Sequence, residues 1–182
     1  MAGSDPVRVV ITGGPGTGKT TLLEELARRG FAVEREVARA ILREPGGMEL
    51  RAQDPLEFAR AMFDAEVLAF ARAGDRAEPT IYDRGLPDIV GFLRLERLPV
   101  PPDIERACRQ MRYDGPVFRT PPWAAIFRQD AQRIQNWEQA RASDEAVARA
   151  WADFGYAVID LPNTTVAVRA DAIIAAIDAT SV

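Results

Sequence analysis

The sequence predicts an α/β domain built on a five-stranded parallel sheet with helices on both faces. Five short runs of apolar or β-branched residues alternate with helical segments along the 182 residues. This alternation favours parallel strands joined by right-handed crossovers, which place helices on both sides of the sheet. Neither a linker nor a repeat divides the chain, and its length suits one domain. We therefore expect residues 1–182 to form a single domain.

The first half of the chain alternates strands with amphipathic helices. The run at 7–12 is β-branched and ends in glycines, as buried parallel strands often do. Asp54 followed by Pro55 is a typical helix start, with an N-cap and a proline in the first turn. The expected apolar stripe of this long helix is Leu56, Ala59, Phe63, Val67 and Phe70. The expected elements are strand 7–12, helix 19–29, strand 31–33, helix 36–42, the long helix from 55, and strand 79–83.

The second half is expected to hold further helices and two strands, separated by breaks rich in proline. The helical stretch at 124–142 has too few apolar positions for a core helix, so we expect it to form most of a lid at about 120–142. Ser143 or Asp144 is the expected N-cap of the next helix. The expected elements are helices 86–97 and 103–112, strand 116–119, helical stretch 124–142, a helix to about 154, strand 156–161 and helix 165–179.

A glycine-rich motif lies between the first strand and the first helix. Residues 13–20 read GGPGTGKT and fit the pattern GxxxxGK[ST], the phosphate-binding P-loop. Its glycines let backbone N–H groups point inward, and the following helix N-terminus adds partial positive charge. In this motif the lysine reaches the β- and γ-phosphates of ATP, and the hydroxyl ligates Mg²⁺. The candidate nucleotide-binding residues are Gly13, Gly14, Pro15, Gly16, Thr17, Gly18, Lys19, Thr20 and Thr21, with Lys19 also catalytic and Thr20 a metal ligand.

Composition narrows the possible functions. Lys19 is the only lysine beside 22 arginines, which points to a position that needs a compact ammonium group. The absence of His excludes His-dependent hydrolases and His-ligated metal centres, and the single Cys108 excludes disulfide frameworks. The net charge of −4 argues against a nucleic-acid partner, and no apolar window predicts a membrane span. We expect a cytoplasmic protein.

Charged residues follow the strand predicted at 79–83. Asp83 ends that strand, where P-loop proteins place a carboxylate that binds Mg²⁺ directly or through water. It could instead accept a proton from a phosphoryl acceptor, or cap the next helix. Arg84 could hold a phosphate or the acceptor. Asp88, one turn on, is either a substrate-binding residue or a solvated helix carboxylate.

Glu34, Glu36 and Arg39 follow the second predicted strand. They would lie at the carboxyl edge of the sheet, where open α/β folds bind ligands. Glu36 and Arg39 are therefore candidates to bind the acceptor, the alternative being a solvated helix face.

Arginines of the lid region are candidates to neutralise charge on a transferred phosphoryl group. They are Arg119, Arg128 and Arg133. The last two are five residues apart and would point about 140° apart on a straight helix. Surface ion pairs are the alternative for each of them.

The chain resembles the bacterial P-loop ATPases often labelled "AAA domain" proteins. The matching segments are ITGGPGTGKTT at 11–21, EVAR at 36–39, DRGLPD at 83–88, PPW at 121–123, Arg133 and LP at 161–162. This group is related to nucleoside and nucleotide kinases and to the ribosylnicotinamide kinase domain of the NAD-biosynthesis regulator. The resemblance implies a three-layer, nucleotide-kinase-like P-loop NTPase fold with an Arg-bearing lid. Near 127–129 the group commonly has a Tyr and an Asn, from which Arg128 and Gln129 depart.

These features predict an ATP-dependent phosphotransferase that moves the γ-phosphoryl group of Mg-ATP to a small acceptor, such as a nucleoside or nucleotide. The candidate catalytic residues are Lys19, Asp83, Arg84, Arg133 and Arg128. The alternative is a stand-alone or regulatory NTPase that hydrolyses ATP without an acceptor. A GTPase is disfavoured because its NKxD motif needs a lysine outside the P-loop. The sequence leaves the acceptor and the oligomeric state open.

Overall fold

The strands of the computed structural model form one parallel sheet in the order β2-β3-β1-β4-β5. The structure describes residues 7–74, 76, 78–127 and 135–180. The strands are β1 (Arg8–Thr12), β2 (Ala32–Glu34), β3 (Thr80–Asp83), β4 (Val117–Arg119) and β5 (Val158–Asp160). The predicted fold class is thereby confirmed.

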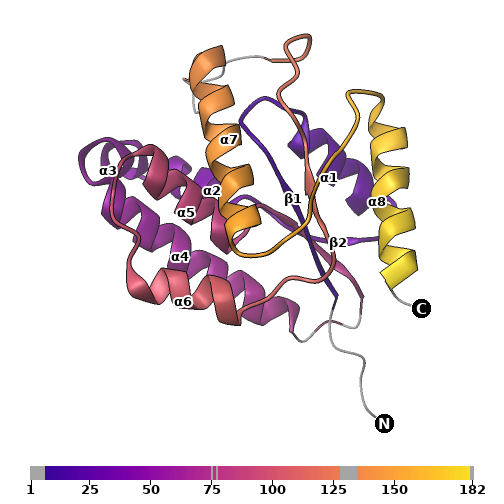
Figure 1. The fold of residues 1–182 in the computed structure, drawn as a ribbon, viewed down its shortest axis with the longest axis horizontal. Coiled ribbons are helices and arrows are strands. Elements are labelled where there is room, and N and C mark those ends of the chain that lie inside the picture. The colour runs from indigo at the N-terminus through magenta and orange to yellow at the C-terminus, as the bar shows by residue number, and fades with distance from the viewer. Residues whose placement is uncertain (1–6, 75, 77, 128–134, 181–182) are drawn as a thin grey trace.

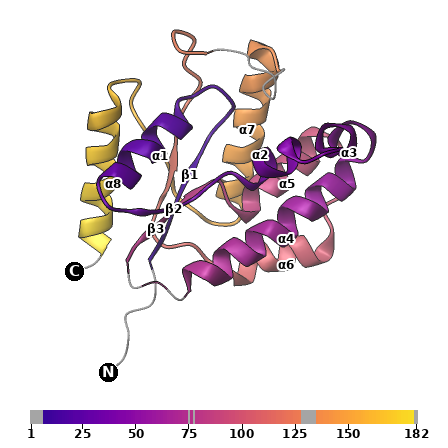
Figure 2. The same cartoon turned by 180° about the vertical axis from the view of Figure 1, so that it is seen from behind.

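Helices cover both faces of the sheet. They are α1 (Lys19–Arg28), α2 (Val37–Arg43), α3 (Gly47–Gln53), α4 (Pro55–Ala73), α5 (Leu86–Leu95), α6 (Pro102–Gln110), α7 (Trp137–Asp153) and α8 (Val166–Thr180). The first and last helices, α1 and α8, pack together on one face, while α4 to α7 lie on the other (Figure 1 and, from behind, Figure 2). Among the described residues, no helix combines the length and hydropathy needed to cross a bilayer.

The core lies in two layers because successive strand residues point to opposite sides of the sheet. Val10 and Tyr82 belong to the cluster beneath α4, α5 and α7, together with the fully buried Trp151. Val9 and Ile11 face the other way, into the cluster formed with α1 and α8. The sheet is therefore a central layer buried on both sides, as parallel sheets are.

Strand register brings the carboxyl ends of the strands together. Ile11 in β1 lies opposite Asp83 in β3, and Thr12 lies opposite Arg119 in β4. Glu34 ends β2 beside Tyr82 of β3. The segments that follow these residues all leave the sheet at one edge, which is where ligands bind in open α/β folds.

Three local features were missed or misplaced by the sequence predictions. The helix expected at 36–42 is present as α2, which ends at Arg43, but the helix α3 that follows Gly46 was not expected. The long helix α4 does begin after an Asp54 cap, but its most buried positions are Phe58, Ala59, Met62, Glu66, Ala69 and Ala73. The most buried face is offset from the expected stripe, in which only Ala59 is fully buried, while Leu56, Phe63 and Phe70 are half-buried and pack against the core.

The third error concerns the segment between β4 and α7. Ser143 and Asp144 do not cap a helix but lie inside α7, which begins at Trp137. Asn136 is the N-cap: its side chain accepts the Gln139 N–H, and its own N–H donates to the Gln139 side chain. Residues 124–127 form a turn and not a helix, while 128–134, with Arg128 and Arg133, lie outside the described residues.

Candidate functional site

The loop between β1 and α1 has positive φ at Gly13, Gly16 and Gly18, a backbone conformation that residues with side chains rarely adopt. Gly18 precedes α1 with φ 83°, in the left-handed region. Gly13 has φ 132°, and a Cβ atom there would lie 2.5 Å from the Thr120 carbonyl oxygen. The loop therefore packs tightly onto the segment after β4 and turns its backbone back toward the start of α1.

Lys19 lies inside the curve of this loop. Its side chain is buried, and Nζ donates to the carbonyl oxygens of Gly13 and Gly14 at 2.9 and 2.6 Å. Burial, and then the positive charge of Arg84, lower the pKa of Lys19 from 10.5 to about 8. The ammonium group therefore lies next to the position where the loop would hold an anion.

Asp144 of α7 anchors the loop from the opposite side. Its fully buried carboxylate accepts the Gly14 N–H at 3.0 Å and pairs with Arg119 at 2.5 Å. Arg119 also pairs with Asp160 at 3.0 Å. Arg119 does not line the cavity described below, so the structure gives it a scaffolding role and not the expected place in a lid.

Thr17 anchors the loop through two further contacts. Its hydroxyl is 2.6 Å from that of Thr120, which follows β4, and its carbonyl accepts a hydrogen bond from Nη2 of Arg169 in α8 at 3.3 Å. Arg169 is 2% exposed, and no carboxylate pairs with it among the described residues. Its Nε has no hydrogen-bond partner there, and burial lowers its pKa. An uncompensated buried guanidinium beside a phosphate-binding loop favours an anion.

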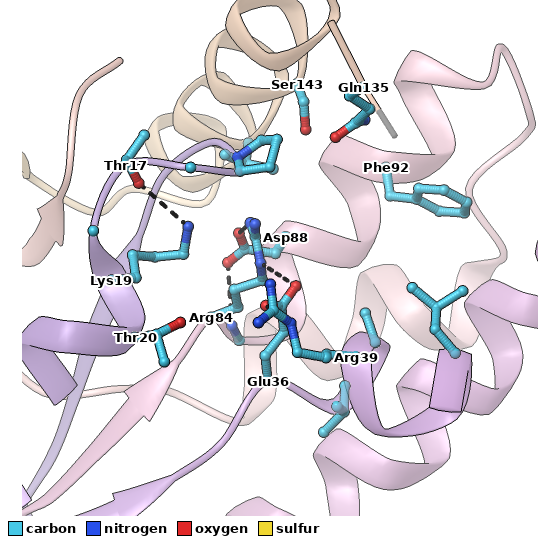
Figure 3. A pocket seen from close by; sticks show the side chains of 18 of the residues that line it. Thr17, Lys19, Thr20, Glu36, Arg39, Arg84, Asp88, Phe92, Gln135 and Ser143 are labelled. Carbon is cyan, nitrogen blue, oxygen red and sulfur yellow. Dashed lines mark hydrogen bonds and ion pairs between the residues drawn. The ribbon is translucent and has the colours of Figure 1, made fainter. Parts of the chain in front are cut away.

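A cavity of about 710 Å³ begins at the loop and extends toward α5. In Figure 3, Lys19 and Thr20 lie on one side of it and Phe92 on the other. The predicted residues that line it are Pro15, Gly16, Thr17, Gly18, Lys19, Thr20, Thr21, Glu36, Arg39, Arg84 and Asp88. The structure therefore brings together most of the predicted site residues, from segments far apart in the sequence.

Arg84 is the centre of a charge cluster in the cavity wall. It pairs with Glu36 and Asp88, each at 3.0 Å, and its backbone has φ 77° (Figure 3). Left-handed backbone is costly for an arginine and is common at functional sites. Burial would lower the pKa of Arg84, but the neighbouring carboxylates raise it overall. Burial likewise opposes ionisation of Glu36, yet Arg84 and Lys19 hold its pKa below the usual value.

Asp88 is not the solvated helix carboxylate that one reading of the sequence offered. It is 6% exposed and accepts hydrogen bonds from the Thr12 hydroxyl at 2.6 Å and Trp151 Nε1 at 2.8 Å. It also accepts from the Gly85 N–H at 3.1 Å, in addition to the ion pair with Arg84. Asp88 therefore fixes the position of Arg84 at the start of α5.

Asp83 lies behind this cluster at the end of β3. It is 7% exposed, and its Oδ1 has no hydrogen-bond partner among the described residues. Burial, then the charge of Glu36, raise its pKa from 3.8 to about 6. A buried carboxylate oxygen without a partner fits a site completed by a cation or a water molecule.

Glu66 was missed by the sequence analysis, as were Asp144 and Arg169. Each is a charged residue in a helical segment, where the usual expectation is a solvated face. Glu66 lies in the buried stripe of α4 and lines the cavity. Only the spacing of Phe58, Met62 and Glu66 at every fourth residue signals that Glu66 shares a face with buried residues.

Comparison with known proteins gives the fold a context. A family model described as an AAA domain matches residues 8–169, and no curated protein matches the chain. Deoxyadenosine kinase from M. mycoides, solved with dCMP and dCDP, has a TM-score of 0.71 at 14% identity, covering 95% of this chain and 100% of that chain. NadR protein in complex with NR has a TM-score of 0.68 at 23% identity. That match covers 97% of this chain but only 50% of NadR.

Thymidylate kinase from Ehrlichia chaffeensis is a third similar structure. Its TM-score is 0.58 at 14% identity, with 96% of this chain and 100% of that chain covered. At these identities the likeness shows a shared fold. The expectation of a nucleotide-kinase-like P-loop architecture is therefore confirmed.

Proposed function

This chain belongs to the AAA domain family, and on that premise we propose that it is an ATP-dependent phosphotransferase acting on a small hydroxyl-bearing acceptor. The observation that carries the proposal is the extent of the cavity. Its lining begins at the P-loop and continues onto side chains of α2, α4 and α5. A volume of about 710 Å³ is in the range of small-molecule sites and leaves room for a second ligand beside the phosphates.

In this proposal the P-loop holds the β- and γ-phosphates of ATP. Backbone N–H groups and the N-terminus of α1 supply donors, and Lys19 exchanges its bonds to Gly13 and Gly14 for phosphate oxygens. Arg169 adds positive potential from beneath the loop. Positive groups from two segments distant in the sequence, the P-loop with α1 and the helix α8, then converge on one anion, as phosphoryl transfer requires.

The residues present also fit Mg²⁺. Thr20 lines the cavity, and Asp83 has the unpartnered oxygen described above. The described residues contain no cluster of three acidic side chains that would hold a metal ion alone. That suits Mg²⁺, which in such sites uses one or two protein ligands together with substrate phosphates. When bound, it would neutralise charge on the β- and γ-phosphates.

Glu36 is the group best placed to accept the acceptor's proton. It lines the cavity and is held ionised by Arg84, whereas Asp88 is already occupied by its hydrogen-bond donors. The acceptor oxygen forms a bond to the γ-phosphorus, the bond from that phosphorus to the β,γ-bridging oxygen breaks, and ADP leaves. The hydroxyl proton passes to the Glu36 carboxylate. Arg39, 3.9 Å from Glu36, would orient the acceptor.

Arg84 would stabilise charge on the transferred group from its fixed position in the wall. The roles of Arg128 and Arg133 as lid arginines stay predictions, since both lie outside the described residues. Their predicted contribution is to neutralise the γ-phosphate when the lid region approaches the cavity.

The test is ADP release from Mg-ATP with and without a panel of nucleosides, nucleotides and ribosylnicotinamide. If the protein is a phosphotransferase, one acceptor class raises the rate of ADP release at least about 10-fold. Lys19→Ala abolishes this increase, while the far-UV circular dichroism of the variant stays that of the parent protein. Slow release that no acceptor changes, but that Lys19→Ala removes, would instead indicate an NTPase that works without an acceptor.

A further inference from the structure

Glu66 is a buried acid that has no partner among the residues the structure describes. It is 3% exposed, lines the cavity, and forms no hydrogen bond or ion pair with any described residue. Burying a carboxyl group without a partner is costly, so such a group in a cavity wall calls for a ligand. Neither the P-loop nor the Arg84 cluster uses it.

The wall around Glu66 is apolar and partly aromatic. Phe58 and Met62 precede it on the same face of α4, and Ile89 and Phe92 of α5 line the same cavity. Phe58 and Phe92 pack edge to face, with ring centroids 5.6 Å apart. Figure 3 shows Phe92 across the cavity from Lys19 and Thr20, so this compartment is the end away from the P-loop. Such a wall suits a flat ring with one polar edge.

The charge state of Glu66 limits which hydrogen-bonding groups the ligand ring can present to it. Burial, then the negative charges of Asp88 and Asp83, raise its pKa from 4.5 to about 8, and Glu34 and Glu36 act in the same direction. The neutral carboxyl group offers one O–H donor and one carbonyl acceptor side by side. Its complement is a ring edge with an adjacent acceptor and donor, as in amide or amidine groups.

We propose that Glu66 is the specificity-determining residue for the acceptor, and that the acceptor is an uncharged heteroaromatic compound whose ring edge hydrogen-bonds to this carboxyl group. This inference rests on the proposed function and adds the class of substrate. The ring lies between α4 and α5, which leaves its hydroxyl-bearing portion toward Glu36 and the P-loop.

The test is calorimetric binding to the full chain with Mg²⁺ and AMP-PNP, so that the P-loop is filled. The probes are deoxyadenosine, deoxycytidine and thymidine, with D-ribose as a ligand that lacks the ring. Glu66→Gln keeps a donor and an acceptor without charge, and Glu66→Leu removes both. Asp64→Asn, an exposed acid on the same helix, is the matched control.

The expected result is that at least one nucleoside binds far more tightly than ribose. Its affinity stays within about 3-fold in Glu66→Gln and Asp64→Asn and falls about 10- to 100-fold in Glu66→Leu, the loss expected when buried hydrogen bonds are left unmade. Equal loss in both Glu66 variants would mean that the ligand needs a negative charge. That result would overturn the proposal. So would an affinity that is unchanged in Glu66→Leu, or the absence of any preference for a nucleoside over ribose.

The AMP-PNP titration separates this inference from the proposed function. If AMP-PNP binds and γ-phosphoryl transfer occurs, but no probe depends on Glu66, only the substrate class is wrong. If AMP-PNP does not bind the wild-type chain, the proposed function itself fails.

Discussion

The buried Glu66 should make the protein less stable as pH rises, and Glu66→Gln should remove that dependence. Its pKa is raised in the folded protein, so the folded state holds the proton more tightly than the unfolded chain. The stability it contributes is fully present below about pH 4.5 and is lost as pH rises toward 8. Gln is neutral and of the same size, so it does not titrate.

The pKa values give the size of the effect. With 4.5 for the unfolded chain and about 8 for the folded protein, linkage makes Glu66→Gln more stable than wild type by about 1 kcal/mol at pH 5 and about 3 kcal/mol at pH 7. For a domain of this length, the difference at pH 7 corresponds to a melting temperature about 10 °C higher.

The assay is chemical and thermal unfolding of both proteins between pH 5 and 8.5, with EDTA present. Asp64→Asn serves as the control, because an exposed acid should give a stability difference near zero that pH does not change. A stability difference between Glu66→Gln and wild type that stays constant across this pH range would show that Glu66 titrates in the folded protein as it does in the unfolded chain.

Two further predictions concern the anchors of the P-loop. Asp144→Asn breaks a buried ion pair with Arg119 and weakens the acceptor for the Gly14 N–H. It should therefore cost about 3 kcal/mol of stability and weaken AMP-PNP binding. The control is Asp153→Asn, which breaks an exposed ion pair on the same helix and should change stability by less than about 1 kcal/mol. Arg169→Met should lower AMP-PNP affinity about 10-fold without lowering the melting temperature, because it removes a buried charge that pairs with no carboxylate among the described residues. A melting temperature that falls while the affinity stays unchanged would contradict the assigned role.

The sequence predicted the parts of the site that depend on local pattern. The P-loop could be recognised because glycine, lysine and threonine occur at fixed spacing between a strand and a helix. Placing Asp83 and Arg84 at the ligand-binding edge required only the strand boundary, since parallel strands all end at the same edge. The structure places both there.

What the sequence could not predict depends on contacts between distant segments. Asp144 lies 130 residues from Gly14 in the chain, and nothing in the polar pattern of α7 indicates that its carboxylate faces the loop. The burial of Asp88 and Glu66 could not be predicted for a similar reason, because an acidic residue in a helix is usually solvated. Burial of such groups is decided by the helices that pack over them.

The destination of the γ-phosphoryl group of ATP distinguishes phosphoryl transfer from hydrolysis. The measurement is incubation of the protein with Mg²⁺, ATP labelled at the γ-phosphate and the nucleoside that binds best, followed by separation of the products. A phosphotransferase places the label on the nucleoside, and Lys19→Ala abolishes this labelling. Label found only in inorganic phosphate, with and without the nucleoside, would contradict a phosphotransferase and leave an ATP hydrolase.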